Sequence, residues 1–282
     1  MSDRSRYDLY LSYSGRKTYL ICPSRYRFRY IQKIPPKIEL RSTGFGSSIG
    51  KVFEWFYERK VWMSADVVSA TLALVEPAVR LTFERDEVNI NVEMELFHRI
   101  VDDVKAYVPS SIESIRKHQL LSESSCAEMD LTTTYTKDGI TLRIGGRADF
   151  VHGSDKSVRI LDGKGSVHRE KFVDSEQLIW YAVQHYLKFK VAPSYLGFLY
   201  YRFPNDPIQW IDFDAQALRD NVKTTFDVAK KIQLKMFDPQ PNPECARCDY
   251  QGRCEEGRKY VAARKVEGDG RINNSIFDLE SL

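Results

Sequence analysis

Two aspartates and a lysine lie in short segments that each read as the end of a β-strand. GGRADF contains Asp149, and ILDGKG contains Asp162 and Lys164. Side chains alternate along a strand, so Asp162 and Lys164, two residues apart, share one face. If the two strands pair, Asp149 approaches Asp162, and two carboxylates at such a distance repel unless a cation lies between them. The expected cation is Mg²⁺ or Mn²⁺, which prefers oxygen ligands, with the carbonyl of Gly163 as a further ligand.

Such a site has the components to hydrolyse phosphodiesters. A divalent cation polarises the phosphate and lowers the pKa of a bound water, and Lys164 can stabilise the nucleophile or the developing negative charge. On the next predicted helix, SEQLIWYA places Gln177 and Tyr181 four residues apart, hence on one face that can reach the strand ends. The alternative for the D-x-K motif alone is a surface Asp–Lys pair beside a β-turn, with no catalytic role.

Cysteines form a second candidate site. The segment CARCDYQGRC supplies Cys245, Cys248 and Cys254 in a C-x2-C-x5-C spacing, and the chain has five cysteines. An odd number excludes complete pairing in disulfides, and the C-x-x-C pair favours metal binding. Zinc and iron–sulfur clusters normally take four ligands, so the pattern predicts a fourth cysteine elsewhere in the chain.

A basic and aromatic stretch lies near the N-terminus. From Arg16 to Arg41 the sequence has eight basic residues against one acidic residue, Glu39. Aromatic residues are interleaved with them at Tyr19, Tyr26, Phe28 and Tyr30. This composition suits a surface that contacts phosphates and unstacked bases. The alternative is an amphipathic helix whose aromatic residues face the core.

The elements that must position these residues change in character along the chain. Up to about residue 125 the pattern is mainly helical, with breaks expected near Pro77 and Pro109. Beyond Cys126, β-branched residues alternate with polar ones, and Lys137-Asp138-Gly139 is typical of a hairpin turn. The expected helices span 12–31, 47–62, most of 64–118, 172–188 and 215–236, and the expected strands span 129–136, 140–151, 157–163, 194–203 and 208–213.

This order of elements predicts an α/β fold in three parts. A mainly helical region covers 1–127, an α/β core covers 128–240, and the cysteine loop and tail cover 241–282. The charged first residues and the short apolar runs predict a cytoplasmic protein without a membrane partner. The segment GFGSSIGKV lacks the glycine and the Ser or Thr that a phosphate-binding P-loop needs.

The order G-x-x-D, D-x-K and Q-x-x-x-Y resembles the nuclease core of the RecB-like branch of the PD-(D/E)XK superfamily. The residues that carry the resemblance are Gly146, Asp149, Asp162, Lys164, Gln177 and Tyr181. It implies a restriction-endonuclease-like mixed sheet flanked by helices. It also implies that Asp149 and Asp162 are metal ligands and that Lys164 is catalytic, with Gln177 and Tyr181 beside the site.

The segment YLSYSGRKTYLICPSRYRF resembles the N-terminal part of the iron–sulfur subclass of these nucleases. That subclass includes the stand-alone CRISPR-adaptation exonucleases and AddB-type nuclease domains. In it, one cysteine before a proline joins a C-terminal trio to hold a [4Fe–4S] cluster, which implies that Cys22 is the fourth ligand. We expect the cluster to be a structural staple, since it closes nearly the whole chain into one loop. Zinc is the alternative, and Cys126 is expected to be a small buried hydrophobic residue.

One position departs from the family pattern. The family usually has an inward His on a glycine-led helix, and GSSIGKVFE places Gly50 at that position. None of the five histidines, at 98, 118, 152, 168 and 185, falls nearby in the sequence. Glu54, one turn further on, shares the face of Gly50 and is the expected replacement ligand. The alternative is a weakened or lost active site.

The resemblance implies a Mg²⁺- or Mn²⁺-dependent DNA exonuclease, which we expect to prefer single strands and to act in recombination, repair or processing of DNA in a prokaryote or phage. The expected partners are DNA with a free end and a helicase, recombination or CRISPR-adaptation protein. The tail NNSIFDLESL resembles peptides that dock on a sliding clamp, with a frayed terminus as the alternative. Two other functions are left open: a catalytically impaired protein that binds DNA ends or a partner, and a zinc-stapled scaffold unrelated to DNA.

Overall fold

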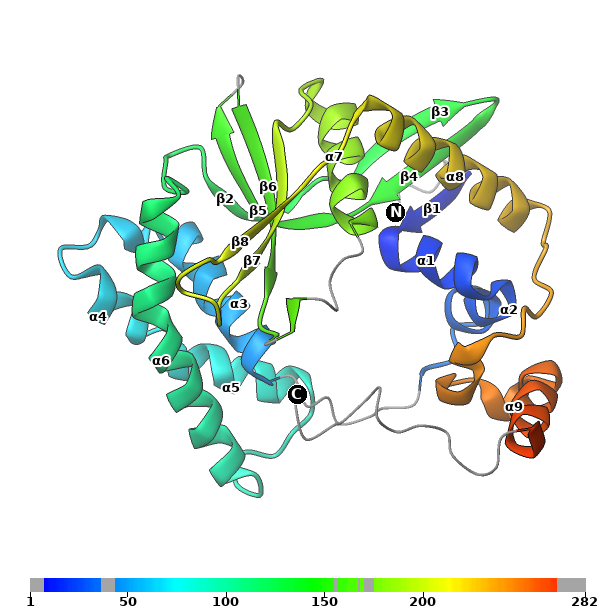
Figure 1. The fold of residues 1–282 in the computed structure, drawn as a ribbon, viewed down its shortest axis with the longest axis horizontal. Helices are drawn as coiled ribbons and strands as arrows, with labels where there is room; N and C mark the ends of the chain where they lie inside the picture. Colours follow the sequence, from blue (N-terminus) through cyan, green and yellow to red (C-terminus); the bar gives the residue numbers. More distant parts are fainter. Residues whose placement is uncertain (1–7, 37–43, 155–156, 167, 170–174, 268–282) are drawn as a thin grey trace, which may run out of the picture. The chain divides into compact units, whose positions relative to one another are not determined.

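The computed structural model describes residues 8–36, 44–154, 157–166, 168–169 and 175–267. The predicted clamp-binding tail, 273–282, and residues 37–41 of the basic stretch lie outside them. The chain forms two compact units, and neither is continuous in sequence (Figure 1). Unit 1 consists of Met1–Glu39, Thr134–Gly145 and Val222–Leu282, and unit 2 consists of Leu40–Thr133 and Gly146–Asn221.

Unit 2 is built on a five-stranded mixed sheet in the order β2-β5-β6-β7-β8. Its strands are β2 (Cys126–Asp130), β5 (Arg147–Ser154), β6 (Ser157–Lys164), β7 (Tyr195–Tyr200) and β8 (Ile208–Ile211). The central strand, β6, is antiparallel to β5 and parallel to β7. Both Ile160 and Leu161 of β6 are buried, although they point to opposite faces, because helices cover the sheet on both sides.

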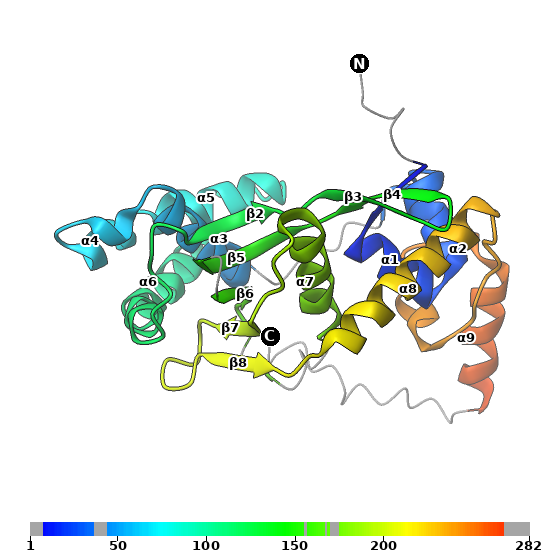
Figure 2. The same cartoon turned by 90° about the horizontal axis from the view of Figure 1, so that it is seen from above.

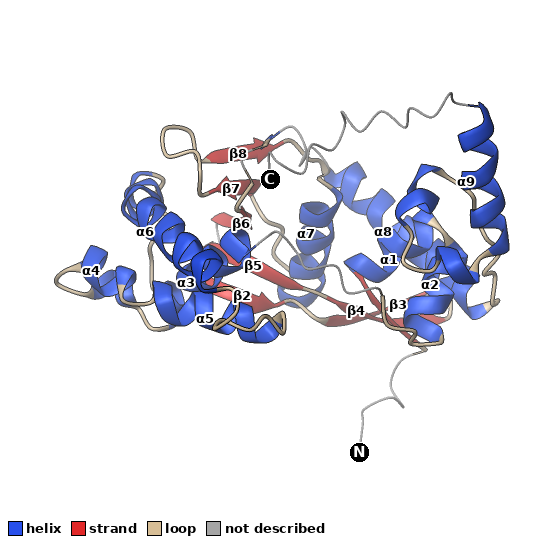
Figure 3. Cartoon of the chain, turned by 90° about the horizontal axis from the view of Figure 1, so that it is seen from below, coloured by secondary structure: helices blue, strands red, loops and turns tan. Residues whose placement is uncertain are grey.

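The helices of unit 2 form one layer on each face of this sheet (Figures 2 and 3). One layer contains α3 (Gly44–Glu58), α4 (Val67–Leu72), a 3₁₀ turn (Val61–Met63), α5 (Val75–Arg85) and α6 (Met94–Lys117), and the other contains α7 (Glu176–Phe189). The buried apolar residues of α3, α5 and α6 form one core with Phe150, Leu161 and Leu199 of the sheet. Burial of these apolar side chains is the main force that holds the helices against the sheet.

Unit 1 contains a smaller sheet in the order β1-β4-β3. Its strands are β1 (Leu9–Ser12), β3 (Thr133–Lys137) and β4 (Ile140–Gly145). Its helical parts are α1 (Tyr13–Ile21), α2 (Pro23–Tyr26), a π-helical turn (Arg27–Ile31), the later part of α8 (Ala215–Gln233), 3₁₀ turns (Pro243–Arg247 and Gln251–Arg253) and α9 (Glu255–Glu267). The predicted hairpin is confirmed: Asp138 (φ 50°) and Gly139 (φ 76°) both adopt the left-handed conformation of a type I′ turn between β3 and β4.

The predicted α/β class, with a mixed sheet flanked by helices, is confirmed and fits a restriction-endonuclease-like fold. The expected strand over 140–151 is instead two strands, β4 and β5, in different sheets. Close packing at the junction explains the division. A Cβ on Gly145 would lie 2.1 Å from the hydroxyl of Tyr10, and one on Gly146 would lie 2.2 Å from Oε1 of Gln184.

The helix break expected near Pro77 is confirmed, because α4 ends at Leu72 and α5 begins at Val75, whereas the break expected near Pro109 is wrong. Pro77 lies in the first turn of α5, where its missing N–H has no partner within the helix. Pro109 lies inside α6 and removes one backbone hydrogen bond. The helix continues through it because its apolar face does: Val104, Val108 and Ile112 are all buried. A further break, which the sequence did not predict, separates α5 from α6 between Arg85 and Met94.

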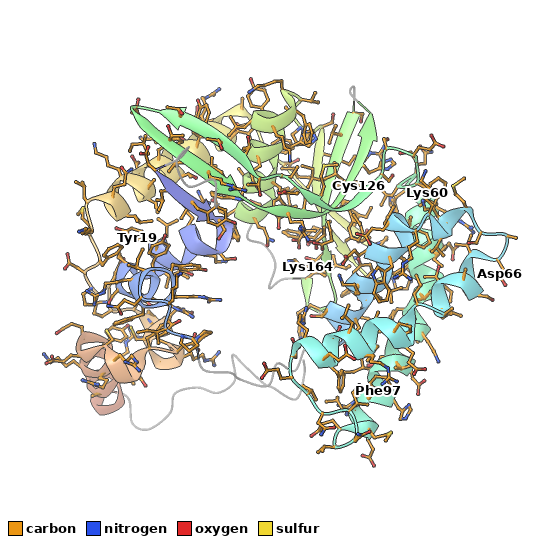
Figure 4. All side chains as sticks on the ribbon, turned by 180° about the vertical axis from the view of Figure 1, so that it is seen from behind. Tyr19, Lys60, Asp66, Phe97, Cys126 and Lys164 are labelled. Atoms are coloured by element: carbon orange, nitrogen blue, oxygen red, sulfur yellow. The ribbon has the colours of Figure 1, made fainter. Side chains whose placement is uncertain are left out.

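The aromatic residues of the basic stretch are mostly core residues. Tyr19 (Figure 4), Tyr26 and Phe28 are buried, and the Tyr19 hydroxyl donates a 2.6 Å hydrogen bond to the carbonyl of Met236. Tyr26 stacks on Tyr30 at 4.9 Å. The amphipathic alternative is therefore the one that the structure supports for these three rings. Within the described ranges, no helix is both long and apolar enough to cross a bilayer.

Candidate active site

Asp149 and Asp162 lie where two neighbouring strands part. The ladder between β5 and β6 ends at the pair Phe150 and Leu161, so the next residue on each strand is one of the two aspartates. Beyond that point β5 is paired with β2 alone. The carboxylate of Asp149 occupies the fork, where its Oδ2 atom accepts a 2.8 Å hydrogen bond from the backbone N–H of Gly163.

Asp162 and Lys164 form an ion pair through Oδ2 and Nζ, as expected for residues two apart on one strand face. Lys164 lies at the end of β6 (Figure 4). Asp162 is almost completely buried, whereas the Lys164 side chain retains 18% exposure. The ammonium also lies 5.5 Å from the ring centre of Phe198. The lysine therefore borders the solvent side of a buried carboxylate.

Both aspartates are held in an environment that disfavours their negative charge. Burial raises the pKa of Asp149 well above its ordinary value, and the nearby Asp162 raises it further. Burial also raises the pKa of Asp162, although the Lys164 ammonium acts in the opposite direction. Two carboxyl groups with pKa values raised in this way are a recognised mark of functional sites. A bound cation would relieve their repulsion.

Helix α7 brings Gln177 and Tyr181 to the same site. The Gln177 amide donates a 2.8 Å hydrogen bond to the Tyr181 hydroxyl, so the two residues share a face as their spacing predicts. Burial raises the pKa of Tyr181, and the charges of Asp162 and Asp149 raise it further. Gly146 explains the close approach of this helix, because any side chain there would overlap Gln184 of α7.

A pocket of about 310 Å³ opens onto Asp149. Its lining includes Glu54 and Gly50 of α3, together with Gly163 and Asp149, so the structure places the predicted replacement ligand beside the carboxylate site. Glu54 forms an ion pair with Lys51. Asp162 and Lys164 do not belong to the lining. None of the five histidines does either, and a Cβ on Gly50 would have no neighbour within 4 Å among the described residues.

Sequence reasoning missed Glu128 of β2. The pairs Ala127–Phe150 and Met129–Ala148 place Glu128 opposite Asp149, so acidic residues occupy one row across β2, β5 and β6. Glu128 lines the pocket and adopts a left-handed backbone (φ 50°), which is unusual for a side chain in a strand. Burial raises its pKa, and Glu54 contributes to that rise. The only available signal was strand alternation, because no motif includes this residue.

Tyr201, which follows β7, was missed as well. It lines the pocket, is 3% exposed and stacks on Phe53 at 5.2 Å. A Cβ on Gly163 would lie 2.8 Å from its hydroxyl, so glycine at 163 leaves room for the phenol. Burial raises the pKa of Tyr201, and Asp149 is the first of the charged neighbours that raise it further.

The donor set fits a hard divalent cation. In the part of the chain that the structure describes, no three His, Cys, Asp or Glu side chains converge on a single ion position. Mg²⁺ does not require such a group, because it commonly binds through one or two carboxylates and keeps several waters. Apart from its ion pair with Lys164, the buried Oδ2 atom of Asp162 receives no hydrogen bond from the described residues, so it has capacity for a cation.

The four cysteines named for the second site line one pocket in unit 1: Cys22, Cys245, Cys248 and Cys254. Backbone N–H groups approach three of the sulfurs. Gln240 donates to Cys22 at 3.5 Å, Asn242 to Cys245 at 3.4 Å and Gly257 to Cys254 at 3.4 Å.

Burial raises the pKa of Cys248, so its thiolate form needs a compensating positive charge. A metal group would provide one, and its four cysteine ligands would be those of the pocket. Cys126 does not line this pocket and is half-buried in β2 of unit 2 (Figure 4).

Comparisons with known proteins place the chain in a family. A family model described as the PD-(D/E)XK nuclease superfamily matches residues 10–255. One similar solved structure is described as "Crystal structure of SSO0001"; it is 16% identical, and the alignment covers 60% of this chain and 80% of that chain with a TM-score of 0.32. A comparison with curated proteins finds no match.

Proposed function

We propose a metal-dependent DNA nuclease activity for this chain, which belongs to the PD-(D/E)XK nuclease superfamily. The observation that carries the proposal is the meeting of Asp149, Asp162 and Lys164 at the fork between β5 and β6, beside an open pocket. Family membership supports a nuclease. The geometry supports Asp149, Asp162 and Lys164 as the residues that would act.

The reaction is the hydrolysis of a phosphodiester: a water oxygen bonds to phosphorus, one phosphorus–oxygen ester bond breaks, and the leaving oxygen takes up a proton. Asp149 and Asp162 would hold a Mg²⁺ or Mn²⁺ ion, with the Gly163 carbonyl as a further ligand. When bound, the ion neutralises charge on the phosphate and makes a coordinated water more acidic. Lys164 stabilises the developing negative charge. Gln177 fixes the Tyr181 hydroxyl beside the two carboxylates.

The test is cleavage of end-labelled single-stranded DNA in Mn²⁺ by the wild type and by Lys164→Ala. We expect the variant to lose at least about 10²-fold in rate, since it lacks the cation that offsets charge at the reacting phosphate. Lys105→Ala is the matched control, because Lys105 is an exposed lysine on α6 outside the pocket. Equal cleavage by the wild type and Lys164→Ala would remove Lys164 from the mechanism.

We further propose that the enzyme is an exonuclease that prefers single strands. The pocket lining supplies Lys51, Arg85 and Arg147 beside the acidic residues, which suits contact with a phosphate backbone, and an exonuclease needs a free strand end. Circular single-stranded DNA should therefore resist digestion while a linear molecule of the same sequence is degraded. Digestion of both at the same rate would show an endonuclease.

A second candidate function is DNA-end or partner binding without cleavage. The observation that favours it is Gly50, which leaves the position of the family's histidine without a ligand. A protein with this function should bind DNA in a salt-sensitive manner. It should give no metal-dependent cleavage products from end-labelled single-stranded DNA.

For the cysteine pocket we propose a [4Fe–4S] cluster that stabilises unit 1. The proposal is supported by four half-buried cysteines that line one pocket and by three N–H···S contacts. Zinc would draw all four sulfurs around one point at about 2.3 Å, whereas a four-iron cluster holds its ligands further apart. Brown protein with absorbance in the violet–blue range would distinguish the cluster from colourless zinc protein.

A further inference from the structure

The hydroxyl of Tyr201 has an unusual position for a buried polar group. The residue is 3% exposed, and its oxygen has no hydrogen-bond partner among the residues that the structure describes. A buried hydroxyl without a partner costs about 1–3 kcal/mol, so native structures rarely retain one without a use. A phenylalanine at this position would pack equally well against Phe53 and would avoid the cost.

The hydroxyl is held firmly in its place. The ring stacks on Phe53 with an interplanar angle of 10°, and the backbone N–H of Tyr201 donates a 3.1 Å hydrogen bond to the carbonyl of Lys164. These contacts join the residue to both α3 and the end of β6. Because neither contact involves the hydroxyl, it is able to bind a group that enters the pocket.

The surroundings decide what it can bind. The hydroxyl lies beside Gly163, whose N–H holds Asp149, and the pocket that Tyr201 lines is the one that opens onto Asp149. An uncharged phenol, with an ordinary pKa of about 10, is a hydrogen-bond donor at neutral pH. Its ligand should therefore be an oxygen acceptor that enters the pocket with the substrate.

We propose that Tyr201 is a further catalytic residue, whose hydroxyl donates a hydrogen bond to a non-bridging oxygen of the phosphate that is cleaved. This inference rests on the proposed nuclease function. The donor would act together with Lys164 on the charge that grows as the phosphodiester breaks. A preorganised donor of this kind typically contributes about 10²-fold in rate.

The first test compares Tyr201→Phe with Tyr57→Phe. Tyr57 is also buried, but its hydroxyl donates a 3.1 Å hydrogen bond to the carbonyl of Leu120, and it does not line the active-site pocket. Tyr201→Phe should lower kcat by about 10²-fold, leave the affinity for DNA nearly unchanged, and keep or raise the melting temperature. Tyr57→Phe should show the reverse, with a lower melting temperature and an unchanged kcat.

The second test uses phosphorothioate DNA, in which sulfur replaces one non-bridging oxygen at the cleaved linkage. Sulfur accepts hydrogen bonds poorly, so one of the two diastereomers should slow the wild type by a larger factor than it slows Tyr201→Phe. If each diastereomer slows the wild type and Tyr201→Phe by the same factor, the proposed contact is overturned. Full activity of Tyr201→Phe on ordinary DNA would overturn it as well.

The outcome also separates this inference from the proposed function. If the wild type cleaves DNA, Lys164→Ala does not, and Tyr201→Phe does, then only the role of Tyr201 is wrong. If the wild type shows no metal-dependent cleavage, the proposed function fails and the role of Tyr201 fails with it.

Discussion

Gly50 is the residue at which the site is least complete. It lines the active-site pocket, and a Cβ there would meet no described atom within 4 Å. A side chain can therefore enter the pocket from α3 without displacing a neighbour. We expect Gly50→His to bind Mn²⁺ more tightly than the wild type and to cleave DNA faster, because an imidazole adds a ligand beside Asp149. Titration of cleavage rate against Mn²⁺ concentration measures this.

Gly50→Ala is the matched control. Both variants remove a glycine from the interior of α3, so Gly50→Ala should stabilise the fold by about 0.5–1 kcal/mol and Gly50→His by less, because histidine is a poorer helix former than alanine. Only the histidine adds a metal ligand. Equal Mn²⁺ dependence in the two variants would show that position 50 does not face the bound ion.

Part of the site could be predicted from the sequence because its residues are local to one another. Asp162 and Lys164 lie two apart on one strand, and Gln177 and Tyr181 lie four apart on one helix, so spacing alone gives their shared faces. Glu128 and Tyr201 could not be found in this way. Glu128 enters through strand register, and Tyr201 enters through packing of its ring on α3.

Helix α7 is an element whose anchoring should depend on pH. His185 of α7 is buried, and its Nδ1 atom lies 2.7 Å from the carbonyl of Val191. Burial lowers the pKa of His185 below its ordinary value of 6.5. The unfolded chain therefore binds a proton near pH 6.5 that the folded chain resists. The contribution of His185 to the free energy of unfolding is therefore fully present above pH 6.5. It is lost as the pH falls towards the lowered pKa of the folded state.

The prediction is measured by urea unfolding at pH 7.5 and pH 5.5. The wild type should lose more free energy of unfolding between these conditions than His185→Gln does, since glutamine cannot take up the proton. A loss of the same size in both proteins would exclude His185 as a source of the pH dependence.

At the level of elements, the sequence predicted the helices and strands better than their ends. Pro109 shows why: the missing backbone hydrogen bond is a local cost, while the buried face of α6 runs along the whole helix and outweighs it. Gly145 and Gly146 show the opposite case. The contacts that divide β4 from β5 come from Tyr10 and Gln184, which are distant in sequence.

For the whole molecule, the cysteine pocket should determine the stability of unit 1. Cys22 and the C-terminal trio lie more than 220 residues apart in the chain, so a cluster that joins them restricts the unfolded state strongly. We expect Cys248→Ser to lose the violet–blue absorbance and to melt at a lower temperature than the wild type. Iron analysis and thermal unfolding measure the two effects.

Cys126→Ser provides the control, because Cys126 lies in unit 2 away from the pocket. It should keep both the iron and the absorbance. Equal iron content in Cys248→Ser and the wild type would contradict the ligand assignment. The two units themselves are built from separated segments of chain, and such long-range assembly has no signature in local sequence patterns.

The central claim is that Asp149 and Asp162 hold a divalent cation at the fork between β5 and β6. Calorimetric titration of Mn²⁺ into the wild type and into Asp162→Asn tests it most directly. The structure predicts a saturable binding event in the wild type that Asp162→Asn loses. The same affinity in both proteins would contradict the claim.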